Sequence, residues 1–253
     1  DVQAHLDENK ELEIKECKLE FEKSVLILDG IIDPLNDGDL VLNIDGSDAS
    51  LGLFSQLLKD EEKKNLNKGD FYFNGMIKGK TFIEIPFIEF SFGFKDFELI
   101  NPVSKRTIKN LNLKGKFVSG ENDDFSEAKL KIDTLNADFP DGTLKLSGSI
   151  KNFLVPEVDL QLYLKADVTG LDEVFKLDII DEIKEKIEIN DNIKGKYIES
   201  EKRFVSEINN AKIFLEDFGF NIPGAIKVDK VNGSIIRKND DYYIDNLSVI
   251  SRR

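Results

Sequence analysis

Apolar residues alternate with polar ones along most of this chain. In short runs, Val, Ile, Leu and Phe occupy every second position, with Lys, Glu, Asp and Asn between them. A period of two is typical of β-strands that bury one face. The clearest runs are Leu12–Ile14, Val25–Ile27, Leu40–Ile44, Phe71–Phe73, Phe90–Phe94, Leu130–Ile132, Leu144–Leu146, Leu160–Leu164, Ile187–Ile189, Ile213–Leu215 and Tyr243–Ile244.

Turn-forming residues separate these runs. Examples are Asn36-Asp37-Gly38, Asp45-Gly46-Ser47 and Pro140-Asp141-Gly142. Proline has a fixed φ and glycine accepts a positive φ, so such segments suit a tight chain reversal. Because strands joined by short turns run antiparallel, the sequence predicts a mainly β, antiparallel fold.

Two segments depart from the period of two and predict amphipathic helices. The first covers residues 51–66, where Leu51, Phe54 and Leu58 lie on one helical face. The second covers residues 171–186, with a similar spacing of apolar residues. We therefore expect a mainly β fold with two or three short helices.

The chain also carries an internal duplication. Residues 11–80 and 127–196 share one pattern of apolar positions, and each ends in Ile-Lys-Gly-Lys, at Ile77–Lys80 and Ile193–Lys196. Duplicated β-rich units usually form an elongated array whose function is spread along a surface. The alignment pairs Phe21 with Phe139, Leu28 with Leu146, Gly30 with Gly148, and Asp39–Leu42 with Asp159–Leu162.

This pattern predicts four regions. Residues 1–80 form a first repeat with its helix near 51–66, and residues 81–126 form connecting strands. Residues 127–196 form a second repeat with its helix near 171–186, and residues 197–253 form a partial third unit. The only methionine is Met76 and the pattern stops before a unit is complete, so we expect a processed product or a fragment.

Composition narrows the classes of partner. The 253 residues include 19 Phe, 5 Tyr and no Trp, and the formal net charge is −14. Phenylalanine has no polar group, so this aromatic content favours dry surfaces. Binding of nucleic acid needs clustered Lys and Arg, which makes nucleic acid an unfavourable partner.

The sequence offers little catalytic chemistry. His5 is the only histidine, so a histidine-dependent triad or a histidine-rich metal site is not expected. Cys17 is the only cysteine and fits a small buried hydrophobe in a strand. There is no run of 18 apolar residues that would span a bilayer. We expect no enzyme, no cofactor and no metal site.

Several segments together resemble one family of proteins. They are Leu111–Gly115, Leu130–Ile132, Phe139–Gly142, Ser147–Phe153, Pro156–Leu164 and Leu171–Phe175. Their spacing of apolar residues, Gly and Asn resembles AsmA-like envelope proteins over essentially the whole chain, without a catalytic signature.

The resemblance implies an elongated, curved antiparallel sheet with a U-shaped cross-section and an apolar inner face. It further implies a bridge-like protein that moves phospholipid between the inner and outer membranes, supporting outer-membrane assembly. The periplasmic location and a tether by an N-terminal helix, which this chain lacks, follow from the family alone. So do partners among inner- and outer-membrane proteins; the oligomeric state is left open.

The alternation by itself allows two interpretations of the apolar positions. If the sheet closes on another layer, they form an ordinary core, and the chain is a structural or surface β-repeat such as a stalk or adhesin. If the sheet stays uncovered, they form a groove for acyl chains. The candidate groove residues are Phe90, Phe92, Phe94, Leu144, Leu146, Leu160, Leu162 and Leu164.

Overall fold

The computed structural model describes thirteen ranges of the chain. They are residues 2–6, 11–21, 24–33, 38–48, 66–80, 85–100, 106–122, 124–139, 142–167, 186–198, 203–222, 226–238 and 241–251.

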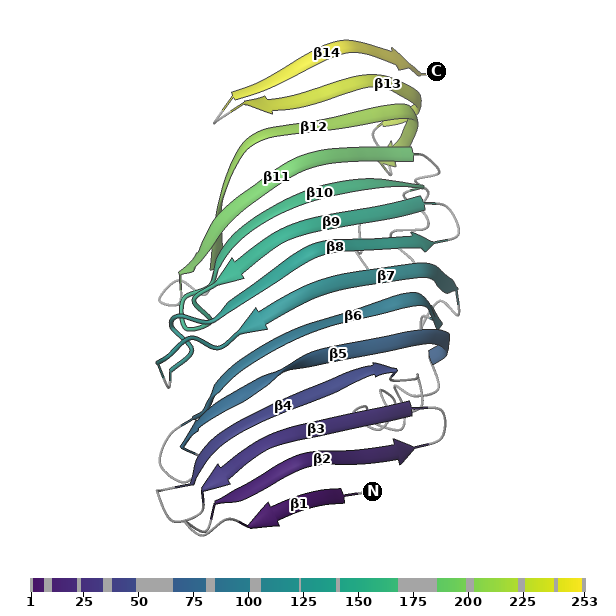
Figure 1. Cartoon of the computed structure of the whole chain (residues 1–253). Helices are drawn as coiled ribbons and strands as arrows, with labels where there is room; N and C mark the ends of the chain where they lie inside the picture. The colour runs from purple at the N-terminus through teal and green to yellow at the C-terminus, as the bar shows by residue number, and fades with distance from the viewer. Residues whose placement is uncertain are drawn as a thin grey trace.

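These residues form one open antiparallel sheet of 14 strands, and each strand pairs with its neighbours in sequence (Figure 1). The strands are β1 (Val2–Leu6), β2 (Leu12–Phe21), β3 (Ser24–Asp33), β4 (Asp39–Asp48), β5 (Leu66–Lys80), β6 (Phe87–Ile100), β7 (Thr107–Val118), β8 (Lys129–Phe139), β9 (Gly142–Lys151), β10 (Glu157–Asp167), β11 (Lys186–Ile198), β12 (Arg203–Ile222), β13 (Ile226–Lys238) and β14 (Asp241–Ile250).

The prediction of a β fold with antiparallel strands is confirmed, and every run of alternating residues lies in a strand. No helix occurs among the described residues. Nearly all of the two predicted helices, 51–66 and 171–186, lies outside them, although their last residues, Leu66 and Lys186, instead begin β5 and β11.

The turn predicted at Asp45-Gly46-Ser47 is wrong. Strand β4 continues through these residues to Asp48. Gly46 pairs with Phe73 of β5, and the Phe73 ring lies where a side chain at position 46 would be. The glycine therefore accommodates a neighbouring ring within the sheet.

Bulges interrupt the period of two in several strands. Between Phe94 and Phe97 of β6, two residues stand opposite one residue of β7. The same two-against-one arrangement follows Leu215 in β12 and Ile132 in β8. A bulge adds one residue and keeps the apolar side chains on one side of the sheet.

Two of these bulges use the same polar contacts. Asp96 and Asp217 both have positive φ, 51° and 53°. The main-chain N–H of Asp96 donates to Oδ1 of Asn112 at 3.1 Å, and that of Asp217 donates to Oδ1 of Asn232 at 2.6 Å. At each of these two bulges, an asparagine on the following strand thus accepts a hydrogen bond from the main-chain N–H of the bulged aspartate.

Asp217 is expected to titrate below the usual aspartate range. A hydrogen bond from Lys230 lowers its pKa most, and Asn232 adds to this effect. A lowered pKa contributes stability above the unfolded-state pKa, and this contribution is lost as the pH falls through the folded-state pKa. Lys230→Ala should therefore move the Asp217 pKa up, as measured by NMR titration of its carboxyl carbon. Lys227→Ala, on the same strand, is the control and should leave the Asp217 pKa in place.

Several of the buried hydrophobic residues form two small clusters. In the first, Phe97 is completely buried and lies with Phe71 against partly buried neighbours. In the second, Phe139 and Ala166 are buried against Leu144 and Leu164. Substantial contacts between the described strands join only sheet neighbours. The described strands therefore form a single layer.

Strands β3–β5 and strands β9–β11 are paired in equivalent registers. Gly30, Leu42 and Ile77 lie opposite one another across β3, β4 and β5. Gly148, Leu160 and Ile193 do so across β9, β10 and β11. This agrees with the aligned pairs Gly30–Gly148 and Ile77–Ile193, but Leu42 corresponds to Leu160 and not to Leu162. The duplication of whole units, and the boundaries of the four regions, stay predictions.

Gly148 occupies a backbone conformation that other residues avoid. Its φ is 137°, and a Cβ there would collide with the main-chain oxygen of Asp159 and lie 2.8 Å from the Leu160 Cα. Such a conformation costs on the order of 1–3 kcal/mol for a residue with a side chain. Gly148→Ala should lower the free energy of unfolding by about that amount in urea denaturation. The neighbouring Ser149→Ala is the control, and equal stability of the two variants would contradict this account.

Candidate functional site

All eight candidate residues lie on one side of the sheet. Residues opposite each other in an antiparallel pair share a face. Pairings link Phe94 through β7–β9 to Leu162, and Phe92 likewise to Leu160. We call this side the apolar face and the other side the polar face. On the apolar face lie Phe90, Phe92, Phe94, Leu144, Leu146, Leu160, Leu162 and Leu164.

These eight side chains are all half-buried. None is enclosed as Phe97 is, and none is fully exposed. Phe94 packs on the first cluster, while Leu144 and Leu164 pack on the second. The candidates therefore support each other sideways within the sheet, and part of each remains open to solvent.

Further residues, which alternation alone does not identify, belong to this face. Strand pairing adds aromatic residues of β5 and β7 and aliphatic residues of β7 and β8 beside the candidates. Only the register between strands reveals them, because each run of alternating residues could face either way. The added residues are Phe71, Phe73, Leu113, Phe117, Leu130, Ile132 and Leu135.

Phenylalanine rings form a connected series on the apolar face. Ring centroids are 5.4 Å apart between Phe71 and Phe73, 5.5 Å between Phe71 and Phe94, and 6.3 Å between Phe73 and Phe90. These separations fall in the range of favourable aromatic pairs. The rings form a continuous apolar surface without a polar group.

Glycines stand opposite several of these rings. Phe90 pairs with Gly75, and Phe92 pairs with Gly115. A Cβ at Gly115 would lie 3.1 Å from the Phe92 ring. The absence of a side chain at these glycines thus allows the rings to pack against the neighbouring strand without a steric clash.

Asp191 interrupts the apolar face. It pairs with Leu162 and is only 8% exposed. Its Oδ1 atom has no hydrogen-bond partner among the described residues. A buried acceptor without a partner costs about 1–3 kcal/mol.

Asp191→Leu should therefore stabilise the fold. Removing the unpartnered oxygen and adding apolar contact with Leu162 should raise the free energy of unfolding by about 1–3 kcal/mol. Urea denaturation at neutral pH measures the change. Asp159→Leu, on the polar face, is the matched control and should give no such gain. A loss of stability in Asp191→Leu would show that the carboxylate has a partner in solution.

The polar face carries paired charges across neighbouring strands. Lys194 lies 3.2 Å from Asp159, and Lys165 lies 3.4 Å from Glu188. Such exposed pairs contribute little stability, with a median near 0–1 kcal/mol. They distinguish the two faces chemically, because the apolar face has almost no charge between β5 and β10.

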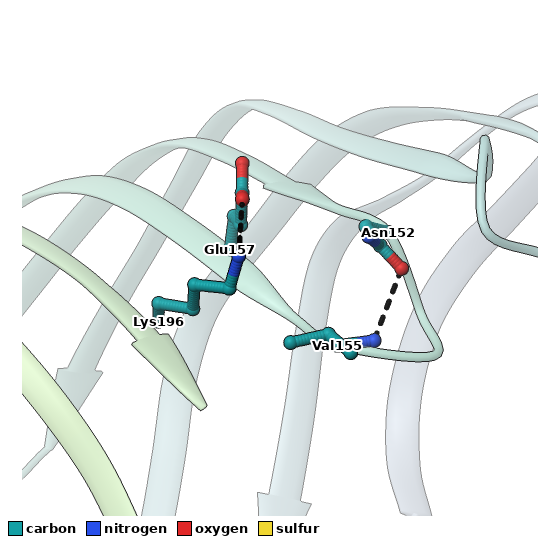
Figure 2. A network of polar contacts seen from close by, with 4 residues as sticks. All are labelled: Asn152, Val155, Glu157 and Lys196. Atoms are coloured by element: carbon teal, nitrogen blue, oxygen red, sulfur yellow. Dashed lines mark hydrogen bonds and ion pairs between the residues drawn. The ribbon is translucent and has the colours of Figure 1, made fainter. Parts of the chain in front are cut away.

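A hydrogen bond within the turn between β9 and β10 and an ion pair next to it are shown in Figure 2. The main-chain N–H of Val155 donates to Oδ1 of Asn152 at 3.0 Å. Nearby, Lys196 lies 3.2 Å from Glu157 on the adjoining strands. The Phe153 ring in this turn meets Phe117 edge-on at 5.8 Å, so the turn extends the apolar face at its rim.

A hollow of about 530 Å³ lies over β8–β11. Strand pairing places most of its lining side chains on the polar face, including Asn136, Lys145, Gln161 and Tyr163. Amides and hydroxyls of this kind bind water or a polar molecule. Most of the hollow's lining therefore lies on the opposite side of the sheet from the candidate groove residues, although Leu146 and Leu162 also line it.

Within the described residues, no group of three or more His, Cys, Asp or Glu side chains is arranged to hold a metal ion. The same part of the chain contains no helix long and apolar enough to cross a membrane.

Comparisons with protein-family models, with curated proteins and with solved structures gave no match. The resemblance to AsmA-like proteins thus rests on the residue patterns of this chain alone.

Proposed function

We propose that this chain is a non-catalytic envelope protein whose apolar face binds and conducts the acyl chains of phospholipids. One observation carries the proposal: eight apolar residues predicted as groove residues lie on one face, and all remain half-buried. In most domains, a second layer of helices or strands covers the apolar face of a sheet. Among the described strands no second layer does so.

The chemistry of the face fits hydrocarbon. Burial of one CH₂ group is worth about 0.8 kcal/mol, so a chain of roughly 16 carbons gains on the order of 12 kcal/mol on leaving water. Between β5 and β10, a surface of Phe, Leu and Ile with almost no charge offers that burial at most positions. Neighbouring positions are nearly equivalent, so a lipid can move along the face without crossing a large barrier.

The proposal includes a groove formed by bending of the sheet. Bulges and glycines with positive φ are the features that bend β-sheets. This chain has bulges in β2, β6, β8 and β12, and Gly30 and Gly148 have φ of 150° and 137°. A sheet bent at these places would surround an acyl chain on three sides.

The location follows from the AsmA-like resemblance. We propose that the protein acts in the periplasm, tethered to the inner membrane by a helix outside this chain. There it would carry phospholipid between the inner and outer membranes and support outer-membrane assembly. Partners among inner- and outer-membrane proteins belong to the same proposal.

A structural role is the second candidate. Complete burial of Phe97 and the packing around Phe139 show that parts of the face already serve as an ordinary core. A stalk or adhesin would need such a core over its whole length, covered by further chain.

Native mass spectrometry of the purified chain separates the two functions. Lipid transfer predicts phospholipid bound to the chain after purification from bacterial membranes. Protein that stays free of lipid, even after incubation with phosphatidylethanolamine vesicles, would contradict the proposal and favour the structural role.

A further inference from the structure

Three neighbouring hollows over β8–β11 form one groove, which we call the polar groove. Their volumes are about 530, 530 and 410 Å³. The first and second hollows share Ser147, and the second and third share Ser149. Along β9 the polar groove extends from Lys145 to Lys151, a length of about 20 Å for an extended strand.

Short side chains of β9 form the floor of the polar groove, and longer side chains of neighbouring strands form its walls. Ser147 pairs with Gln161 of β10, and Ser149 pairs with Lys131 of β8. Asn192 of β11 continues the row beyond Gln161. The order of short and long side chains across the strands therefore creates the groove on the polar face.

The polar groove is positively charged, although the whole chain is acidic. Six lysines and three carboxylates of the polar face line it, a local balance of +3 in a chain of net charge −14. Lys129, Lys145 and Lys151 have no ion pair with any carboxylate among the described residues. The other three lysines neutralise the carboxylates in the pairs Lys131–Asp133, Lys194–Asp159 and Lys196–Glu157.

Two of the lysines without an ion pair lie directly opposite each other. Lys129 of β8 pairs with Lys151 of β9, and both are exposed. Glu157, on the other side of Lys151, contacts Lys196 instead (Figure 2). Opposite residues have Cβ atoms about 4.5–5.5 Å apart, and like charges at this separation destabilise a sheet. An anion between the two ammonium groups would remove the repulsion, so the pair is suited to an acidic group of a ligand.

Neutral hydrogen-bonding groups occupy the rest of the polar groove. Gln161, Asn190 and Asn192 present amides that both donate and accept, as sugar hydroxyls do. At this end Tyr163 adds a ring, with Nζ of Lys145 5.8 Å from its centroid. An aromatic ring packs well on the C–H side of a sugar ring. A phosphate ion would contact the lysines and leave this row of groups unused.

We propose that the polar groove binds an acidic oligosaccharide. Its acidic group lies between Lys129 and Lys151, and its hydroxyls bond to the serine and amide side chains toward Tyr163. The polar groove and the apolar face lie on opposite sides of the sheet. The proposal therefore goes beyond lipid binding and does not depend on it.

An array of immobilised oligosaccharides tests the proposal. The intact chain, labelled with a fluorophore, is applied to oligosaccharides that carry uronate, sulfate or phosphate groups and to neutral counterparts of the same sugars. We expect binding to acidic members, and binding at least about tenfold weaker to their neutral counterparts, which lack the charge-assisted contacts. Absence of binding to every acidic member, or equal binding to the neutral ones, would overturn the proposal.

A double substitution tests the lysine pair. Lys129→Gln with Lys151→Gln should weaken binding of the best acidic oligosaccharide by about tenfold in isothermal titration calorimetry. The matched control is Lys78→Gln with Lys227→Gln, which removes the same charge from two exposed lysines outside the three hollows and should leave the affinity unchanged. An equal loss in both double variants would show that only the net charge matters, and it would overturn the assignment to this pair.

A third variant tests the hollow itself without changing a charge. Ser147→Leu fills the floor and should weaken binding of the same oligosaccharide by about tenfold or more, while circular dichroism shows an unchanged fold. Unchanged affinity would mean that the lysines alone attract anions, which contradicts binding in the polar groove. Vesicles of phosphatidylglycerol are the further probe. If they bind and no acidic oligosaccharide does, the lysines face a membrane surface and the proposal is wrong.

Discussion

Phe97→Ala should cause the largest loss of stability of any single substitution in the described sheet. The Phe97 side chain has 0% exposure. Its ring centroid lies 4.7 Å from that of Phe94, and the buried Phe71 belongs to the same cluster. Truncating a buried phenylalanine costs about 3–5 kcal/mol, through lost burial and the cavity left behind.

Urea denaturation followed by circular dichroism measures this loss. Phe214→Ala is the matched control, because Phe214 is an exposed phenylalanine on the polar face, with Lys212 above its ring. We expect the control to lose no more than about 1 kcal/mol. If both variants lose the same amount, the cluster around Phe97 is not the packed centre of this sheet.

Phe97 also shows why sequence reasoning found only part of the face. Counting by twos from Phe90 gives Phe92 and Phe94 and then passes over Phe97 to Glu98. The bulge at Asp96 shifts the count by one, which returns Phe97 to the side of the other rings. The sequence sign of the bulge is an aspartate between the two phenylalanines, matched by Asn112 on the next strand. A strict period of two cannot detect it.

Other differences have the same origin in contacts between strands. The predicted alignment of residues 11–80 with residues 127–196 is two residues out of register at Leu42, because alternating aliphatic residues align equally well at either register. The sequence predicts a turn at Gly46 because the contact that requires glycine there is made by the Phe73 ring, which is distant in sequence. Strands follow from local alternation, whereas register, bulges and glycine contacts follow from the neighbouring strand.

The same limit applies to the candidate site. Alternation could place Phe92 and Leu160 each on one of two faces, and three strands, β7–β9, separate them in the chain order. Pairing through Gly115, Ile132 and Gly148 puts them in one row across the sheet. That row defines a line along which an acyl chain would lie, and it makes the lipid proposal testable at either end.

Phe92→Glu should remove lipid binding while the chain stays folded. Phe92 is half-buried, so the new carboxylate can reach water as long as no lipid covers the face. Once an acyl chain covers it, the carboxylate loses water without gaining a partner, which costs several kcal/mol. The variant also loses the apolar surface of the ring, worth about 1.5–3 kcal/mol. Bound phospholipid should fall to less than about a tenth of the unsubstituted level, since each 1.4 kcal/mol is a factor of ten.

Native mass spectrometry and lipid extraction measure the retained phospholipid, and circular dichroism checks the fold. Ile31→Glu makes the same change of charge on the polar face and should retain lipid normally. Leu160→Glu, at the other end of the row, should reproduce the loss. Normal retention in both Phe92→Glu and Leu160→Glu would exclude the row from the lipid path. Loss in Leu160→Glu alone would confine the path to β9–β11, because the rings of β5 and β6 would then act only as core.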